Sequence, residues 1–531
     1  MTTSNKNNIP YLEKKERAFK LMVDGKPFIS LAGEVHNSSS SSLKYMDEHV
    51  WERLVYFNCN TAVVPVSWEL IEPIEGQFDF TLVDGLIEGA RRHNLKLVLI
   101  WFGMWKNSHS TYVPGWVKRD QTRFPRVQSS GGGKLPIVSC HSNEALQSDS
   151  NAFRALMKHI ADVDHTDRTV IMMQVENEVG FLGTDRDYSP HANALFEHDV
   201  PDELIEYLKQ HSNQLSPELK KQWNAELTVS SSWKEHFGKS AGVIFTSWHM
   251  ARFLDQVTAA GKAEYNLPMF VNVWLKQYEE QEPGQYPSGG PIQDMIDIWK
   301  AGGPHIDIIA PDIYLNEFAE VCEVYARPDN ALFIPETRRD KVTAANVFYA
   351  VGEHNALGYT PFGIETMDNG IDPFGAGFLP PTHFMVMDSV GIGPLLSKSF
   401  ELIHHMTPLI SKYAGTGKMR GVLQDKAYPS AIRLGAYRLP IRFKNRIHSE
   451  DAPAGGLIIA VSDFEFIIVG HSFSVEFISL DPAGVRTDFL SIDEGSFRDG
   501  MWIPGRRLNG DEYRVSLGSE PQALKVSLYN Y

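Results

Sequence analysis

Two glutamates at the ends of apolar, strand-like runs are the first candidates for chemistry in this chain. Glu178 ends the run VIMMQVENE (170–178), and Glu336 lies near the end of ALFIPETR (331–338). Two carboxyl groups about 5 to 5.5 Å apart can hydrolyse a glycosidic bond with retention of configuration. One attacks the sugar carbon, and the other protonates the leaving oxygen and then activates water. The acid must stay protonated beside a charged partner, so its pKa must be raised by burial or by that neighbour.

Three neighbours of these glutamates have side chains that suit the same chemistry. Asn177 precedes Glu178, and an amide at this place can hydrogen-bond a sugar 2-hydroxyl, a contact that strengthens in the transition state. Strand alternation puts Glu176 on the same face as Glu178 and Asn177 on the other, unless the strand end bends. Glu176 then either orients a neighbour or binds sugar. Tyr314 ends the run IDIIAPDIY and could donate its hydroxyl to Glu336, which keeps that carboxyl ionised.

Aromatic side chains at strand ends would suit a sugar ligand, because a sugar ring presents apolar C–H faces that pack on indole. For any one tryptophan, packing in the core is the favoured interpretation. Beyond the third run, Trp105 and Asn107 favour a role in the site, whereas for His36 packing and sugar binding have equal weight. The residues with predicted sugar contacts from this set are Trp68, Trp105, Trp274, Asn107 and His36.

Eight short apolar runs, separated by helical segments, must position these residues. Most are continuous rather than alternating, which is typical of parallel strands buried on both faces. Eight strand-then-helix units predict a (β/α)8 barrel, whose site lies at the carboxyl ends of the strands. An open doubly wound sheet is less favoured, because no GxGxxG motif follows a strand. The runs are 27–34, 61–68, 96–102, 170–178, 268–274, 306–314, 331–338 and 359–365.

The remaining segments predict insertions and a second domain. The long connections 103–169 and 179–267 would decorate the catalytic face of the barrel. After a last helix near residue 410, short runs separated by Gly, Pro, Asp and Asn are typical of an antiparallel β-sandwich. We therefore predict a barrel domain over 1–410 and a β-sandwich over 411–531.

Composition excludes several classes of protein. The chain has 531 residues and a net charge of −16, which argues against a nucleic-acid partner. Its three cysteines form neither a disulfide framework nor a metal motif. No signal peptide and no membrane helix are predicted, so we expect a cytoplasmic protein without membrane partners. We expect no cofactor and no metal. The oligomeric state stays open, with a homo-oligomer as one possibility.

Three segments together resemble glycoside hydrolases of clan A, and family 35 β-galactosidases in particular. QVENEVG (174–180) is similar to the family's QxENEYG motif, and WELIEPIEGQFDF (68–80) resembles its WNxHEPxxGxFDF segment. GEVHN (33–37) lies where the family has a GSIHY-like segment. The resemblance implies Glu178 as acid/base, Glu336 as nucleophile, and sugar contacts from Asn177 and Glu176. It also implies release of terminal non-reducing β-D-galactosyl residues. The C-terminal β-domain resembles that of a subgroup that includes xyloglucan-active β-galactosidases.

Two departures from the family leave other substrates open. Asn107, within MWKNSHSTYVPGW, stands where a galactose-binding Glu is expected, and IETMDNG after the eighth run lacks the family's HGGTNFG-like stretch. A β-glucosidase, β-xylosidase or α-L-arabinopyranosidase of the same clan is therefore the alternative. A metal-dependent barrel hydrolase using Glu34 and His36 is disfavoured, because the chain has neither HxH on the first run nor HExxH. A non-catalytic sugar-binding protein is disfavoured because both catalytic positions hold Glu.

Overall fold

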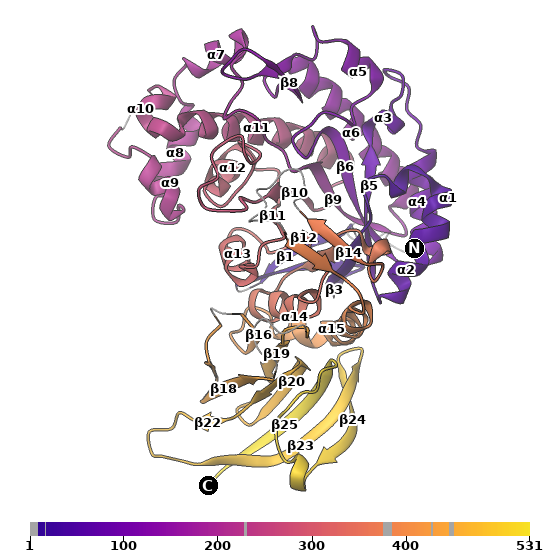
Figure 1. The fold of residues 1–531 in the computed structure, drawn as a ribbon, viewed down its shortest axis with the longest axis vertical. Helices are drawn as coiled ribbons and strands as arrows, with labels where there is room; N and C mark the ends of the chain where they lie inside the picture. The colour runs from indigo at the N-terminus through magenta and orange to yellow at the C-terminus, as the bar shows by residue number, and fades with distance from the viewer. Residues whose placement is uncertain (1–8, 16, 228–230, 375–384, 426–427, 445–450) are drawn as a thin grey trace, which may run out of the picture. The chain divides into compact units, whose positions relative to one another are not determined.

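Eight parallel strands form a closed barrel in the computed structural model (Figure 1), which describes residues 9–15, 17–227, 231–374, 385–425, 428–444 and 451–531. Neighbouring strands follow chain order, and the last strand pairs in parallel with the first. The predicted (β/α)8 barrel is confirmed. Its strands are β4 (Ser30–Glu34), β5 (Thr61–Ser67), β6 (Lys96–Lys106), β9 (Val170–Asn177), β10 (Met269–Trp274), β11 (Ile308–Ile313), β12 (Ile334–Thr337) and β13 (Gly358–Pro361).

The barrel strands are buried almost without interruption, which explains why their sequences are continuous apolar runs rather than alternating ones. The first run, 27–34, does not form a single strand, because it is interrupted at Ile29 between β3 and β4. Its beginning forms β3 (Lys26–Phe28), which joins β1 (Tyr11–Lys15) and β2 (Ala18–Val23) in an antiparallel N-terminal sheet that the run alone does not predict.

Amphipathic helices follow the strands. In α4 (Thr81–Arg92), Leu86, Ile87 and Ala90 are buried on one side, as the helical periodicity predicts. The two longest helices lie in the two long connections: α6 (Asn143–Asp164) and α11 (Ala241–Glu264). Other helices of these connections are α5 (Gly115–Arg119), α7 (Pro190–Phe196), α8 (Asp202–Gln210), α9 (Pro217–Gln222) and α10 (Trp233–Phe237). The remaining ones are α1 (Leu43–Tyr45), α2 (Trp51–Tyr56), α3 (Trp68–Ile71), α12 (Ile296–Gly302), α13 (Phe318–Tyr325), α14 (Thr343–His354) and α15 (Gly393–Tyr413).

Two short hairpins also lie outside the barrel sheet. The Gly-rich segment SSGGGK joins β7 (Arg126–Gln128) to β8 (Lys134–Val138), and Gly132 there has a φ of +80°. The strands β14 (Ile371–Phe374) and β15 (Met385–Asp388) pair in antiparallel fashion after the eighth barrel strand.

The C-terminal part consists of two antiparallel sheets that share one apolar core, as the predicted β-sandwich requires. Side chains of both sheets, such as Leu439 and Ile468, are buried in that core. The larger sheet has the order β16-β19-β20-β25-β23-β24, and the smaller sheet contains β17, β18, β21 and β22. Their bounds are β16 (Met419–Leu423), β17 (Ala431–Leu434), β18 (Tyr437–Phe443), β19 (Gly455–Ala460), β20 (Glu465–His471), β21 (Phe473–Val475), β22 (Ile478–Ser479), β23 (Thr487–Arg498), β24 (Met501–Leu508) and β25 (Gln522–Asn530).

One predicted strand in this part is wrong, and one hairpin was not predicted. EYRVSL, expected to be a strand, contains the end of a 3-10 turn at Glu512 and only an isolated bridge at Ser516. The sequence pattern does not predict the longest hairpin, β23 and β24. Its residues are mixed in type, mostly half-buried in β23 and mostly exposed in β24. Asp499 and Gly500 both have positive φ at its turn, which is the backbone that tight hairpins prefer. The domain boundary near residue 410 stays a prediction.

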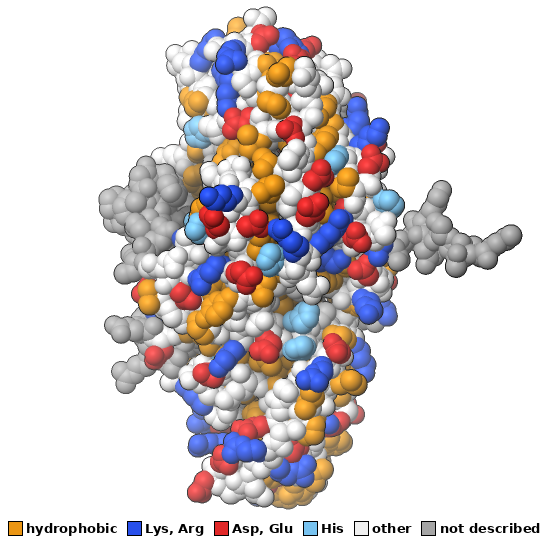
Figure 2. Space-filling view, turned by 90° about the vertical axis from the view of Figure 1, so that its right-hand side faces the viewer, with side chains coloured by type: hydrophobic (Ala, Val, Ile, Leu, Met, Phe, Trp, Pro, Cys, Tyr) orange, Lys and Arg blue, Asp and Glu red, His pale blue; other side chains and the backbone are white. Residues whose placement is uncertain are grey.

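Acidic and basic side chains are interspersed on the face drawn in Figure 2, without a broad area of one sign among the coloured residues. Phosphate-backbone binding needs concentrated positive charge, so this face has no sign of it. Among the described residues, no helix combines the length and the apolar character that crossing a membrane requires. Cys59, Cys140 and Cys322 are buried free thiols.

Candidate active site

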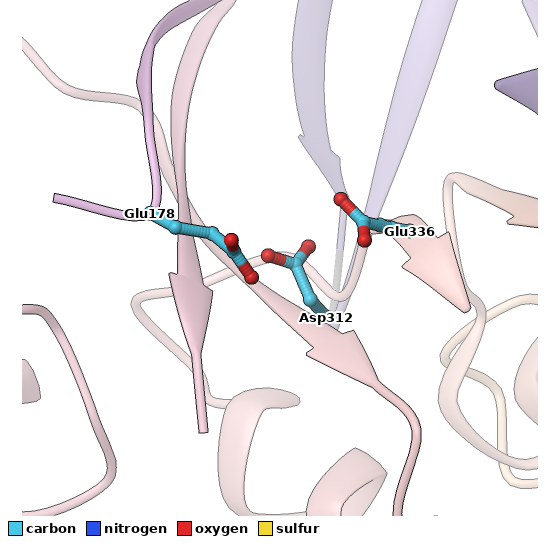
Figure 3. Close-up of side chains that lie close together, drawn as sticks. All are labelled: Glu178, Asp312 and Glu336. Carbon is cyan, nitrogen blue, oxygen red and sulfur yellow. The ribbon is translucent and has the colours of Figure 1, made fainter. Parts of the chain in front are cut away.

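Three carboxyl groups meet at the carboxyl ends of three barrel strands. Glu178 follows β9, Asp312 lies in β11 and Glu336 lies in β12; one oxygen of each is within 4.8 Å of the others. Figure 3 shows Asp312 between the two glutamates. All three side chains are buried, with exposed fractions of 5%, 2% and 7%. The structure therefore brings the two predicted glutamates together and adds an aspartate that was not predicted.

The end of β9 bends sharply, which changes the faces expected from alternation. Glu176 and Glu178 have φ values of +61° and +46°, in the left-handed region that residues other than glycine rarely adopt. The backbone N–H of Glu178 donates to Oδ1 of Asn272 on β10 at 2.8 Å. Conformations of this kind cost about 1 kcal/mol or more each and cluster at functional sites.

The loop after β6 holds Glu178 from a second side. Nδ2 of Asn107 donates to Oε2 of Glu178. The backbone N–H of Ser108 donates to the Glu178 carbonyl at 3.2 Å. Asn107 and Ser108 are themselves left-handed, with φ values of +49° and +58°. Asn107, predicted to contact sugar, thus contacts the carboxyl group that the resemblance assigns as acid/base.

Tyr314 and its support orient Glu336. The Tyr314 hydroxyl donates to Oε1 of Glu336 at 2.6 Å, as predicted from the strand positions. Arg338 donates to the Tyr314 carbonyl at 3.3 Å and to Oδ1 of Asn316 at 2.9 Å, and it pairs with Asp340. Oε2 of Glu336 is buried and has no hydrogen-bond partner among the described residues. The phenol holds one oxygen of the carboxyl group in place and leaves the other oxygen for attack.

Asn177 presents a buried donor beside these carboxylates. Its Oδ1 accepts a hydrogen bond of 2.9 Å from Nζ of Lys106, which fixes which end of the amide faces the lysine. Its Nδ2 is buried and makes no hydrogen bond within the described part of the chain. Such an orphaned donor is costly unless a ligand satisfies it. The geometry is suited to the predicted contact with a sugar hydroxyl.

Glu176 points to a different set of partners. It is fully buried and accepts backbone hydrogen bonds from Met104 at 2.8 Å and Trp105 at 2.6 Å. Burial, and then the neighbouring carboxyl of Asp149, raise the pKa of Glu176 well above its usual range. Asp149 also accepts a hydrogen bond of 2.8 Å from Nε1 of Trp101. Of the two roles predicted for Glu176, these contacts favour support of the β6 end.

The predicted aromatic contacts divide into two groups. Trp68 and Trp105 are fully buried, and their indole N–H groups donate to Glu72 and to the Val138 carbonyl. Neither ring has a solvent-exposed face, so the structure supports packing for both, because large rings at strand ends fill the space between barrel and helices. Trp274 is partly exposed at the end of β10, level with Asp312 in the sheet.

His36 is partly exposed after β4. Its backbone N–H donates to Glu365 at 3.0 Å, and Nε2 lies 2.9 Å from the Thr366 hydroxyl. Its ring packs edge-on against Phe362. These contacts tie the loops after the first and eighth barrel strands together, and either a packing or a binding role fits them.

Sequence reasoning missed Asp312 and Asn272. Nδ2 of Asn272 donates to Oδ2 of Asp312 at 2.7 Å, while Oδ1 of the same amide accepts from Glu178. One signal could have found Asp312, because it lies two residues before Tyr314 and therefore on the same strand face. Asn272 is a polar residue within an otherwise apolar buried strand, which is a weaker signal of the same kind.

Among the described residues, these three carboxylates also form a group that could hold a metal ion, because hard cations prefer oxygen ligands. Glu336 and Glu178 already have hydrogen-bond donors in Tyr314 and Asn107. Donors of this kind stabilise carboxylates whether or not an ion is bound. Independence from metal stays a prediction.

Two family models match parts of the chain. Residues 48–236 match glycoside hydrolase family 42, described as β-galactosidase, and residues 396–518 match a domain of unknown function, DUF5597. The first match supports a β-galactosidase-like glycoside hydrolase fold of clan A, and it does not select family 35. No curated protein sequence matches the chain.

Solved structures of several hydrolases are similar in part. A β-galactosidase from Bacillus circulans sp. alkalophilus is 15% identical; the match covers 72% of this chain and 57% of that one, with a TM-score of 0.46. A β-galactosidase from the psychrophilic Marinomonas ef1 is 12% identical, with 73% and 60% covered and a TM-score of 0.44. The catalytic domain of a β-amylase from Paenibacillus polymyxa is 10% identical, with 64% and 94% covered and a TM-score of 0.43. The chain spans less than two thirds of the two β-galactosidases.

Proposed function

We propose that this chain is a retaining exo-β-galactosidase, with Glu336 as nucleophile and Glu178 as acid/base. One observation carries the proposal: buried carboxyl oxygens of these residues lie within 4.8 Å of each other. Retaining glycosidases need about 5 to 5.5 Å between the two carboxyl groups, whereas inverting enzymes leave about 6.5 to 9.5 Å for a water molecule. The match of residues 48–236 to a β-galactosidase family supports the same reaction class.

In the first step, Oε2 of Glu336 attacks the anomeric carbon and forms a covalent glycosyl ester. The bond to the leaving oxygen breaks, and the proton of Glu178 moves to that oxygen. The Tyr314 hydroxyl keeps its hydrogen bond to Oε1 and so holds the attacking carboxylate in one orientation. The group Nδ2 of Asn177 can donate to a sugar hydroxyl as positive charge develops on the ring.

In the second step, Glu178 removes a proton from water as the water oxygen attacks the anomeric carbon. The ester bond breaks, Glu336 regains its charge, and the sugar leaves with its original configuration. Asn107 donates to Glu178 and so limits the rotation of its side chain in both steps. The two carboxyl groups supply acid, base and nucleophile, and the cycle returns each to its starting protonation state.

Galactose specificity, the family 35 assignment and xyloglucan oligosaccharides as substrates are the finer parts of the proposal. They follow from the sequence resemblance, and Asn107 in place of the expected Glu is the main reason to test them. The alternative is another retaining exo-glycosidase of the clan, such as a β-glucosidase, β-xylosidase or α-L-arabinopyranosidase.

The experiment is a panel of aryl glycosides assayed with and without a chelator. We expect the highest kcat/KM with the β-galactoside, no loss of activity after chelation, and a β-configured sugar as the first product in NMR. An α-configured first product would refute the retaining mechanism. A clear preference for the α-L-arabinopyranoside or the β-glucoside would replace galactose while leaving the mechanism intact. Activity lost on chelation and restored by one cation would refute metal independence.

A further inference from the structure

The chain Asp312–Asn272–Glu178 has a direction that the hydrogen bonds fix. The backbone N–H of Glu178 can only donate, so the amide end of Asn272 that faces it must be the oxygen. The other end, the NH2 group, therefore faces Asp312 and donates to its Oδ2 at 2.7 Å. Asp312 is an acceptor in this bond, and a donor aimed at a carboxylate favours its charged form.

Asp312 stands close to both carboxyl groups of the proposed reaction. One of its oxygens lies within 4.8 Å of oxygens from Glu178 and Glu336, and its side chain is 2% exposed. Two unit charges at such a distance interact by several kcal/mol even with an effective dielectric constant of about 20. Three buried carboxylates therefore cannot all ionise readily, and such a cluster tends to hold a proton.

The neighbours and the proposed mechanism together indicate which group holds that proton. Glu336 has the Tyr314 hydroxyl, and Asp312 has the Asn272 amide. Glu178 has an amide donor in Asn107. The proposed mechanism requires an ionised Glu336 for attack, and the Asn272 amide favours a charged Asp312. In this scheme the proton belongs to Glu178, the proposed acid, and the negative charge of Asp312 beside it favours that protonated form.

We propose that Asp312 is a positioning residue whose fixed negative charge keeps Glu178 an acid before the first step and a base in the second. When Glu336 becomes an ester, its charge disappears, and Asp312 is then the remaining negative charge beside Glu178. Without the charge of Asp312, Glu178 would become a weaker base as soon as the ester formed. It would then take a proton from water less readily. The inference rests on the proposed retaining mechanism and deepens it.

The test is the pH profile of Asp312→Asn, a substitution that keeps shape and can still accept from Asn272. With a galactoside whose leaving group needs protonation, we expect the basic limb of kcat/KM to move to a pH lower by about one or more. At a fixed pH on that limb, kcat/KM would fall about tenfold if the limb moved from about pH 8 to about pH 7. In a Glu178→Gln background the limb that Glu178 produces is absent, so the same substitution should not shift the pH dependence that remains.

Asp297→Asn is the matched control. Asp297 is equally buried, at 1% exposure, but its carboxylate accepts from the backbone of Ser216 outside the barrel strands. It should leave the basic limb unmoved. An unmoved limb in Asp312→Asn together with a raised KM would overturn the proposal and assign Asp312 to a sugar hydroxyl instead.

A measurement on the wild-type protein covers the case in which Asp312→Asn does not fold. The carboxyl of Glu178 is titrated by carbon-13 NMR before and after Glu336 is trapped as a fluorosugar ester. We expect the pKa of the Glu178 carboxyl to fall on trapping but to stay above that of an ordinary glutamate. A fall of this pKa to the ordinary value would overturn the role of Asp312. Failure of the wild type to cleave any glycoside would instead refute the proposed function, before either test applies.

Discussion

The Tyr314 hydroxyl and Oε1 of Glu336 are joined by a hydrogen bond of 2.6 Å between neighbouring barrel strands. The phenol is buried and its own backbone carbonyl is held by Arg338. The tyrosine therefore fixes one oxygen of the carboxylate, and the other oxygen is the one that can react.

Tyr314→Phe should lower kcat about tenfold to a hundredfold, because a hydrogen bond to a charged group contributes about 1.5–3 kcal/mol. We expect little change in KM, since the phenol contacts the nucleophile rather than the sugar. Steady-state kinetics with an aryl galactoside measure both. Tyr349→Phe on α14 is the control for loss of a buried hydroxyl. A rise in KM with an unchanged kcat would show that Tyr314 binds substrate instead.

Glu178→Ala and Glu336→Ala should respond differently to azide. With an activated aryl galactoside, Glu178→Ala can still form the glycosyl ester, which then accumulates for want of a base. Azide needs no base, so it should restore turnover and give β-galactosyl azide. Azide can also replace the missing nucleophile in Glu336→Ala, where it should give the α-azide from the same face. Proton NMR of the product distinguishes the two anomers.

The two roles would be reversed under the opposite outcome. A β-azide from Glu336→Ala, with Glu178→Ala inert, would make Glu178 the nucleophile. Mass spectrometry of the trapped ester gives an independent readout, because the labelled peptide must contain Glu336.

Asp149→Asn should stabilise the protein at alkaline pH. Burial raises the pKa of both Asp149 and Glu176, and the Asp149 carboxyl raises that of Glu176 further. A folded-state pKa above the unfolded value of about 4 contributes stability at low pH that is lost as the pH rises. The Asn side chain does not ionise, so the variant avoids the loss of stability that Asp149 causes as the pH rises. Its amide oxygen can still accept the hydrogen bond from Trp101. We expect the free energy of unfolding to be about 1 kcal/mol larger than in the wild type at pH 8, with little difference at pH 4.

Denaturant unfolding at the two pH values provides the measurement. Equal destabilisation at both would mean that the Asp149 carboxylate is needed for packing and that its titration is irrelevant.

His141→Phe should protect the protein against acid. Burial, then His191 and Arg186, lower the pKa of His141 to about 3. Its ring packs beside Phe245 and His249. Its depressed folded-state pKa contributes stability above the unfolded value of about 6.5, and this is lost as the pH falls toward 3. In thermal melts, the Tm of the variant minus the Tm of the wild type should be larger at pH 4.5 than at pH 8. A constant difference across this range would contradict the titration of His141.

The barrel could be predicted because its signal is repeated and local. Each strand is buried on both faces, so each appears as an apolar run, and the eight runs fix the ends at which Glu178 and Glu336 must lie. The same logic fails for β23 and β24, whose exposed faces erase the contrast on which the pattern depends.

The site was less predictable where backbone conformation decides direction. Alternation along an ideal strand gives Glu176 and Glu178 one face, but left-handed backbone at both residues turns them toward different partners. Trp68 and Trp105 illustrate a second limit, because a large ring at a strand end suits both a ligand and a core. Asp312 shows a third limit. Its spacing from Tyr314 gives its strand face, but its closeness to two glutamates far away in the sequence appears only in the folded barrel.

The left-handed backbone at Glu178 has a consequence for directed evolution. Glycine at this position would relieve the backbone strain, and asparagine is better tolerated there than glutamate. Because Glu178 is the proposed acid/base, such variants would lose activity while they gain stability. Selection for heat resistance alone would therefore enrich such variants. A screen that aims at a robust enzyme must score turnover in every round, because here stability and activity draw on the same residue.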